Sequence, residues 1–328
     1  MKRIIGGAAS PASAQVKWLE VGEESAGQRL DNFLMRELKG VPKTHVYRII
    51  RSGEVRINKG RAAADNRVAE GDVVRVPPVR VSAEPAGGDR PAPAREFPLL
   101  FEDEHLLAID KPAGTAVHGG SGVSFGVIEQ LRQARPSARL LELVHRLDRE
   151  TSGILLVAKK RSALVKLQDQ FRDRETGKTY LALVAGDWPE RKKVIDLPLH
   201  KYLQADGERR VKVVTKDDPN GMRAITLVKV ARKLEGFTLL EVTIKTGRTH
   251  QIRVHLAAQG HAIVGDDKYG DFELNRSLQK KGLRRMFLHA WRLQFAHPAS
   301  GERIELLAPL PPDLAKFAAH EIHPTAPL

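Results

Sequence analysis

The sequence predicts an α+β protein of two domains, a small helix–helix–β domain followed by a larger domain built on a mixed, mainly antiparallel sheet. Three observations predict this fold class. Two amphipathic stretches precede short alternating segments near the start of the chain, a run rich in Pro, Gly and Ala follows at residues 82–95, and long apolar strands come after it. A chain of 328 residues is also long enough to form two hydrophobic cores.

The first domain begins after an aperiodic stretch. Residues 1–16 are small and polar, and we expect a flexible tail there. A helix is predicted over residues 28–39, because apolar residues recur there at the i, i+3, i+4 and i+8 spacing of one helix face. These residues are Leu30, Phe33, Leu34 and Leu38. A second helix follows, with Thr44 as its N-cap and Gly53 marking its end.

Short strands complete this first domain, which we place at residues 17–81. Alternating apolar residues predict strands at 55–57 and 73–76, with a turn at Asn58–Lys59–Gly60. The run SAEPAGGDRPAPAR is typical of a linker, and the larger domain then occupies residues 96–328. Its expected strands are residues 105–110, 154–158, 180–184, 211–215, 224–230 and 237–244, and its expected helices are residues 162–171 and 250–259.

Composition excludes several classes of function. The chain has no cysteine, and therefore no disulfide, thiolate nucleophile, iron–sulfur cluster or cysteine-bound zinc. It has no G-x-G-x-x-G or P-loop pattern, so we expect no nucleotide cofactor. The N-terminal apolar run ends at Ile5, short of a signal peptide, and no stretch approaches the ~20 apolar residues that span a bilayer. We therefore expect a cytoplasmic protein that does not contact a membrane.

Positive charge indicates a polyanionic partner. The chain has 54 Lys and Arg against 40 Asp and Glu, a net charge of +14, and phosphate contacts release condensed counterions. Between Arg29 and Arg61, nine basic residues stand against three acidic ones. Solvated helix faces would have the same composition, but the concentration around one helix pair favours contact with nucleic-acid phosphates. The candidate RNA-binding residues here are Lys43, Arg48, Arg51, Arg56 and Lys59.

The segment LVHRLDRETSGILLVAKK places an acid between two arginines. Asp148 lies between Arg146 and Arg149, just before a Thr–Ser–Gly turn that opens a buried strand. Neighbouring guanidinium groups stabilise an ionised carboxylate, which could act as a nucleophile or as an anchor. A structural ion pair or a turn-capping Asp is commoner in proteins. The local residues alone favour the structural role.

A second segment, IKTGRTHQIRVHLAAQGHAIVGDDKYG at residues 244–270, concentrates polar and basic side chains. Within eight positions it contains Arg248, His250, Gln251, Arg253 and His255. On a helix the two histidines would lie about 140° apart around the axis, so they would not converge on a metal ion, and the arginines would repel one. We expect no metal site. Recognition of a polyanion or a carboxylate fits better, with Arg253 as the partner of an acid across a pocket.

The third segment, GKTYLALV, contains Tyr180, one of only four tyrosines. A half-buried tyrosine on a strand usually packs against the core. In a nucleic-acid enzyme, the same ring could stack on an unpaired base.

Together these segments resemble the RluA-type pseudouridine synthases, from about Gly27 to the C-terminal region. The motifs HRLDRETSG at 145–153, KTYLALV at 178–184 and GRTHQIRVHLAAQGHAIVGD at 247–266 stand in the order of that family. The segment RLDNFLMRELKGVPKTHVYRIIRSGEVRIN at 29–58 resembles the S-four-type (alpha-L) RNA-binding domain. Within the family, the likeness is to the members that modify the ribosomal large subunit.

The resemblance implies a role for each matching residue. Asp148 would be the catalytic nucleophile, Arg253 its ion-pair partner, and Tyr180 the ring that lies against the target uracil. The implied RNA contact is Arg146, which would enter the RNA where the base leaves its stack. Polyanion recognition by the second segment adds Arg248 and His250 as candidate RNA-binding residues. Isomerisation of a uridine requires neither a redox step nor a metal, so the resemblance implies no cofactor.

The resemblance also implies the partner. We expect a monomer that isomerises specific uridines of large-subunit (23S) ribosomal RNA, either as free RNA or in an assembly intermediate, after the target base has flipped out. The alternative is a non-catalytic RNA-binding factor in ribosome assembly. A carboxylate-dependent glycosidase would need a second acid beside Asp148, where the sequence has arginines.

Overall fold

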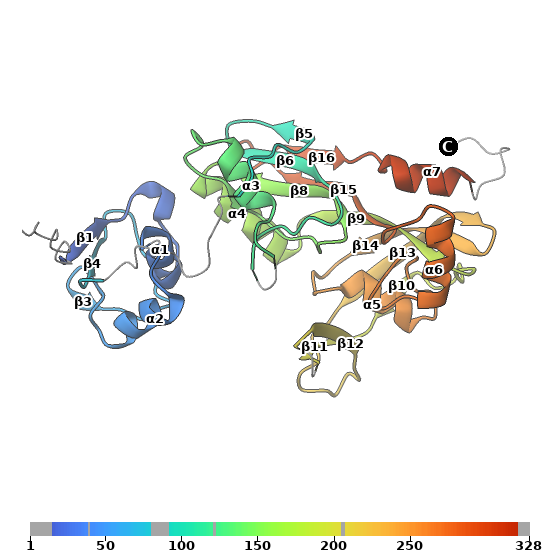
Figure 1. The fold of residues 1–328 in the computed structure, drawn as a ribbon, viewed down its shortest axis with the longest axis horizontal. Coiled ribbons are helices and arrows are strands. Elements are labelled where there is room, and N and C mark those ends of the chain that lie inside the picture. The colour runs from blue at the N-terminus through green and yellow to red at the C-terminus, as the bar shows by residue number, and fades with distance from the viewer. Residues whose placement is uncertain (1–14, 39, 80–91, 121–122, 205–206, 321–328) are drawn as a thin grey trace, which may run out of the picture. The chain divides into compact units, whose positions relative to one another are not determined.

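A computed structural model of the chain consists of two compact units, Met1–Arg90 and Pro91–Leu328, whose elements are labelled in Figure 1. The structure describes residues 15–38, 40–79, 92–120, 123–204 and 207–320. The tail predicted at 1–16 lies outside the described residues except for its last two, and most of the linker predicted at 82–95 lies outside them as well.

The small unit packs two helices on a four-stranded sheet, as the hydrophobic spacing predicts. All four apolar residues predicted for the face of the first helix are buried, and Val46, Ile49 and Ile50 of the second complete the core with Val55 and Val74. The helices are α1 (Leu30–Glu37) and α2 (Lys43–Arg51), preceded by the short 3₁₀ turn η1 (Glu23–Ser25). The strands are β1 (Lys17–Glu20), β2 (Arg56–Ile57), β3 (Gly60–Arg61) and β4 (Val73–Val76), in the order β1-β4-β2-β3.

Of two local predictions for this unit, one is confirmed and one is wrong. The turn between β2 and β3 is confirmed: Asn58 and Lys59 both have positive φ, 48° and 70°, as a two-residue hairpin loop requires. The N-cap predicted at Thr44 is wrong. The N-cap is Pro42, whose carbonyl accepts from the N–H groups of His45 and Val46 at 2.9 and 3.1 Å. A proline suits this position because its missing N–H is not needed there.

The large unit is a mixed sheet in which β15 and β8 run parallel and every other pairing between described strands is antiparallel, so the predicted fold class is confirmed. The central strand order is β10-β13-β14-β9-β15-β8-β6-β5, with β16 beside β15 and β7 beside β8. The strands of this sheet are β5 (Leu99–Glu102), β6 (Leu106–Lys111), β7 (Glu142–Leu143), β8 (Ser152–Ala158), β9 (Gly177–Ala185), β10 (Val194–Asp196), β13 (Ile225–Leu234), β14 (Phe237–Ile244), β15 (Leu288–Ala296) and β16 (Arg303–Leu307).

Five helices and a separate hairpin accompany this sheet. The helices are α3 (Val127–Ala134), α4 (Arg161–Asp173), α5 (Gln251–Ala258), α6 (Phe272–Lys280) and α7 (Pro312–His320), and the hairpin strands are β11 (Leu199–Leu203) and β12 (Arg209–Val213). Figure 1 shows α3 and α4 beside β6 and β8, and α5 beside β13, with the hairpin projecting from that end of the sheet. No helix in the described part of the chain is both long and apolar enough to cross a membrane.

Strand β8 directly follows the loop that contains Asp148. All seven of its residues are buried, which suits its continuous apolar run in the middle of the sheet. Its second residue, Gly153, has φ +111°, and a Cβ atom there would collide with the carbonyl oxygen of Ala290 on β15. The Thr–Ser–Gly turn therefore lets β15 approach closely and fixes where the chain leaves the Asp148 loop.

Candidate active site

The three segments singled out in the sequence meet in one pocket of about 110 Å³. Asp148 lies on the loop between β7 and β8, Tyr180 comes from β9, and Arg248, His250 and Arg253 come from the start of α5 and the loop before it. These segments are far apart in the sequence. Their convergence makes this pocket the candidate active site.

A buried lysine fixes the loop that carries Asp148. The Lys111 ammonium donates to the carbonyl oxygens of Pro112 and Thr115, each at 2.9 Å, and of Arg149 at 3.2 Å. Its side chain is completely buried, and this burial lowers its pKa to about 7. The backbone of Arg149, directly after Asp148, is therefore tied to the end of β6. Hydrophobic patterning does not predict this role, because it depends on a tertiary contact.

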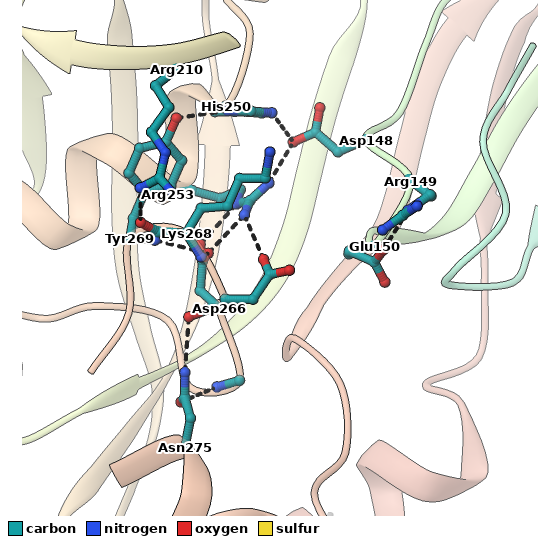
Figure 2. Close-up of polar contacts among 12 residues, drawn as sticks. Asp148, Arg149, Glu150, Arg210, His250, Arg253, Asp266, Lys268, Tyr269 and Asn275 are labelled. Carbon is teal, nitrogen blue, oxygen red and sulfur yellow. Dashed lines mark hydrogen bonds and ion pairs between the residues drawn. The ribbon is translucent and has the colours of Figure 1, made fainter. Parts of the chain in front are cut away.

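Two basic side chains face the same oxygen of Asp148. Arg253 Nη1 lies 3.6 Å from Asp148 Oδ2, and His250 Nε2 lies 3.9 Å from it, as Figure 2 shows. Both distances are too long for hydrogen bonds, so the carboxylate keeps its lone pairs available, and Arg253 acts on it through its charge. The Asp148 side chain is 20% exposed, whereas that of Arg253 is only 3% exposed. A carboxylate in this position can attack a bound electrophile.

The principal partner of Arg253 is Asp266, not Asp148. Arg253 donates from Nε and Nη2 to the two carboxylate oxygens of Asp266 at 2.8 and 2.7 Å, and Asp266 also accepts from the backbone N–H groups of Lys268 and Tyr269. Burial alone would lower the pKa of Arg253, but the hydrogen bonds and charge of Asp266 raise it. The guanidinium is thus held rigidly, with Nη1 left to face Asp148. Asp266 is the last residue of the motif at 247–266, but its role was not predicted.

His250 has an unusual backbone and a second polar contact. It is the N-cap of α5 with φ +53°, so the helix begins one residue later than predicted. Its Nδ1 lies 2.8 Å from the hydroxyl of Tyr269, which also accepts from the N–H of Val211 at 3.0 Å. With the Tyr269 hydroxyl donating to Nδ1, the imidazole proton lies on Nε2, which faces Asp148. Burial lowers the pKa of His250 despite the nearby carboxylate, which favours this neutral form.

Gln251 shapes the loop before α5. Its side-chain oxygen accepts from Thr246 Oγ1 at 2.7 Å and from the N–H of Arg248 at 3.1 Å, and its amide nitrogen donates to Ile225 O and Thr226 Oγ1, both at 2.9 Å. These bonds join the loop to β13 and thereby position His250. His255 lies in the core, within 2.8 Å of Thr226 Oγ1 and 2.9 Å of Leu197 O. The two histidines therefore do not share a site, and no three His, Asp or Glu side chains of the described residues form a metal-binding group.

Tyr180 borders the pocket from β9. Its ring packs against two hydrophobic clusters of the large unit. Burial, assisted by the charge of Asp148, raises the pKa of its phenol, so the ring is neutral. Tyr180 thus combines a core contact with a face in the pocket, and both roles weighed for it in the sequence are compatible with its position.

The arginines that flank Asp148 in sequence do not pair with it. Arg149 pairs with Glu150 at 2.7 Å (Figure 2). Arg146 is exposed where it borders the pocket, and Arg248 donates from Nε to the carbonyl of Arg223 at 3.2 Å. Among ion pairs between described residues, Asp148 has only His250 and Arg253 as partners. The sequence neighbours of Asp148 were expected to stabilise the carboxylate, but its ion-pair partners come from α5 and its N-cap.

The basic residues predicted in the small unit lie on its surface. Lys43, Arg48 and Arg51 are exposed on α2, and Arg56 and Lys59 are exposed on the β2–β3 hairpin. Arg48 Nη1 lies 3.8 Å from Glu54, a contact that is well screened by solvent at 60% and 42% side-chain exposure. These side chains are therefore available to phosphates.

The similarity of this chain to known proteins shows its family. Residues 105–258 match the family model described as RNA pseudouridylate synthase. The ribosomal large subunit pseudouridine synthase C of Yersinia pestis is 52% identical over 300 residues, which cover 90% of this chain and 92% of that protein. The chain belongs to the RNA pseudouridylate synthase family. The protein of the same name from Pasteurella multocida (strain Pm70) is 51% identical over 306 residues, covering 92% of this chain and 93% of that one.

Further matches describe the small unit and the fold of the chain. Residues 28–74 match the S4 domain, so the small unit of this pseudouridylate synthase is an S4 domain. The solved structure of human RNA pseudouridylate synthase domain containing 4 matches with a TM-score of 0.56 at 28% identity, covering 68% of this chain and 92% of that one. Human RNA pseudouridylate synthase domain containing 1 also matches with a TM-score of 0.56, at 26% identity, covering 70% and 90%. The membership decides for an RNA-modifying enzyme and against a glycosidase.

Proposed function

We propose that this enzyme converts specific uridines of large-subunit (23S) ribosomal RNA into pseudouridines in the cytoplasm, with Asp148 as the nucleophile. The substrate is supported by the names of the two bacterial relatives, which share about half of their residues with this chain. The nucleophile is supported by one observation. The carboxylate of Asp148 faces the pocket and accepts no hydrogen bond from the described residues, and Arg253 Nη1 lies 3.6 Å from it.

The chemistry is an isomerisation. The bond from uracil N1 to ribose C1′ breaks, the ring turns, and a bond from C5 to C1′ forms; C5 loses its proton and N1 gains one. Asp148 attacks an electrophilic carbon of the nucleotide and leaves again, so the enzyme ends unchanged. Arg253 and the N–H of His250 stabilise the carboxylate whenever it carries its full charge. Asp266 acts through Arg253 and is a positioning residue.

The target base must leave the RNA stack to reach Asp148. The pocket volume of about 110 Å³ suits a single base rather than a base pair. Unstacking costs about a few kcal/mol, and stacking on the Tyr180 ring offsets part of that cost. Arg146, exposed at the edge of the pocket, would occupy the place that the base leaves.

Replacing Tyr180 by alanine should slow the reaction by about 10- to 100-fold, because stacking of a base on an aromatic ring contributes ~1–3 kcal/mol. Single-turnover rates on an RNA substrate would measure this loss, and the dissociation constant should change much less. Tyr180→Phe is the matched control, since it keeps the ring and should retain most of the rate. Equal rates for Tyr180→Ala and the wild-type enzyme would leave the ring with a core-packing role only.

The S4 domain should supply salt-dependent affinity. Replacing Lys43, Arg51 and Lys59 by glutamine should flatten the plot of log affinity against log salt, by about 0.7–0.9 for each phosphate that is no longer neutralised. Fluorescence anisotropy with labelled RNA at several KCl concentrations measures this slope. A variant with three glutamines at Arg276, Lys280 and Lys316, on α6 and α7, controls for net charge. If both variants have the same slope, these residues of the S4 domain are only a solvated face.

A further inference from the structure

A second cavity adjoins the active-site pocket. It has a volume of about 490 Å³ and shares five lining residues with the pocket, Arg146, Tyr180, Ile244, Gly247 and Arg248. It extends from there along the end of α4 and the start of β9. We call this cavity the basic groove. Its lining has no acidic residue, and its cationic residues are Arg146, Arg172, Arg174, Lys178, Lys245 and Arg248.

Most of these cations have no carboxylate partner. Arg172 is paired, with Asp169 at 2.8 Å and Asp173 at 3.5 Å. For the other five, no Asp or Glu oxygen of the described residues lies within 4.0 Å. They come from three separate segments, so the fold and not the local sequence brings them together. Like charges gathered without counter-charges repel one another, and an anion in the groove would relieve this repulsion.

Part of the groove wall is formed by packed, partly buried side chains. The ammonium of Lys178 lies 5.0 Å from the ring centre of Phe171, and the Phe171 ring stacks on His145 with centroids 4.6 Å apart. His145 Nε2 accepts from the N–H of Leu156 at 3.1 Å, and burial lowers the pKa of His145 to about 3, so this imidazole is neutral. Burial also lowers the pKa of Lys178. A partly buried ammonium without a carboxylate is unfavourable unless a ligand compensates for it.

The C-cap residue of α4, Arg174, adds another cation to the groove lining. Arg174 is the C-cap of α4 with φ +65°, in the left-handed region where glycine is usual and a larger residue is strained. The arginine at this position borders the groove and is exposed. Such outliers are concentrated at functional sites, where the surrounding structure maintains them. Lys245 also lines the groove and is exposed directly after β14.

We propose that the basic groove binds the phosphodiester backbone of the RNA strand on one side of the target uridine. This inference rests on the proposed function, because it assumes that the target base occupies the pocket beside Asp148. The groove starts at the pocket and is more than four times as large, so it can take the chain that continues from a flipped nucleotide. Lysine and arginine supply the contacts that fix the register of a nucleic acid.

The test uses the full-length enzyme with Arg174 and Lys245 both replaced by glutamine. Neither residue lines the pocket around Asp148. With a single-stranded RNA containing the target uridine, affinity should fall by roughly tenfold at moderate salt, and the slope of log affinity against log salt should decrease by about 1.4. The single-turnover rate at saturating enzyme should stay within twofold of wild type. Arg276→Gln with Lys280→Gln, on α6, removes the same charge outside the groove and should change neither quantity.

A second measurement locates the contacts along the strand. Neutral methylphosphonate linkages are placed one at a time around the target uridine, and the affinity of each RNA is measured. Linkages bound in the groove should weaken binding to the wild-type enzyme and have no effect on the Arg174→Gln/Lys245→Gln variant. Equal losses for both proteins at every linkage, or an affinity and slope that match the α6 control, would overturn the proposal. Affinity and pseudouridine formation are measured in separate assays, so failure of the proposed function would appear on its own, as absence of pseudouridine with wild-type enzyme.

Discussion

An enzyme with Asp148 replaced by asparagine should lose pseudouridine formation by roughly 10⁴-fold or more, the scale of loss when a catalytic nucleophile is removed. Asparagine has nearly the same shape, but its amide cannot form the covalent bond that the carboxylate forms. The reaction replaces the hydrogen at C5, so release of tritium from RNA labelled at C5 of uridine follows turnover directly. A single-turnover assay with excess enzyme gives the rate of the chemical step.

The same variant separates catalysis from binding. Asp148 makes no hydrogen bond through its carboxylate among the described residues, so the substitution should leave folding unchanged and RNA affinity within a few-fold of wild type. Circular dichroism and anisotropy check these two controls. A variant that folds, binds RNA and releases tritium at the wild-type rate would exclude Asp148 as the nucleophile. Retained cellular function without catalysis would instead mean that the cell depends on RNA binding by this enzyme and not on the modification.

Replacing Asp266 by alanine should have the second-largest effect, and on two quantities at once. It leaves the guanidinium of Arg253, whose side chain is 3% exposed, without its bidentate partner. Removing one member of such a buried pair typically lowers the free energy of unfolding by about 3–5 kcal/mol. Urea denaturation measures this loss. Activity should also fall, because Arg253 would no longer be held with Nη1 toward Asp148.

A double variant distinguishes the positioning role from a loss of stability. Arg253→Met with Asp266→Leu removes both charges and replaces them with apolar side chains, so part of the free energy of unfolding should return. The N–H groups of Lys268 and Tyr269 still lack the acceptor that Asp266 provides. Activity should remain low, because the charge beside Asp148 is still missing. A double variant that recovered both stability and turnover would mean that the Arg253–Asp266 pair serves the fold alone.

Hydrophobic spacing predicted the elements whose burial has a regular period. The faces of α1 and α2, the strand β4 and the strand β14 were all predicted within a residue or two, because each buries a repeated pattern. Helix α6 was missed, although Asp271 accepts from the N–H groups of Glu273 and Leu274 as a regular N-cap. That capping signal was readable in the sequence. The strand β15 was missed because its run mixes His, Trp and Arg with apolar residues.

The sequence predicted the residues of the pocket better than their partners. Asp148, Tyr180 and Arg253 meet in one pocket, as the motifs implied. The partner of Arg253 lies 13 residues along the chain at Asp266, and that of His250 lies at Tyr269. Both contacts depend on how the turn after α5 folds back, which hydrophobic periodicity does not describe. The groove cations are similarly brought together by long-range packing.

The most direct test of the central claim is a map of the pseudouridines in large-subunit ribosomal RNA. The map compares a strain that lacks this protein with the same strain expressing either the wild-type enzyme or the Asp148→Asn variant at equal levels. The proposed function predicts that specific pseudouridines disappear in the deletion strain, return with the wild-type enzyme and do not return with the variant. An unchanged map in the deletion strain, or full restoration by Asp148→Asn, would contradict it.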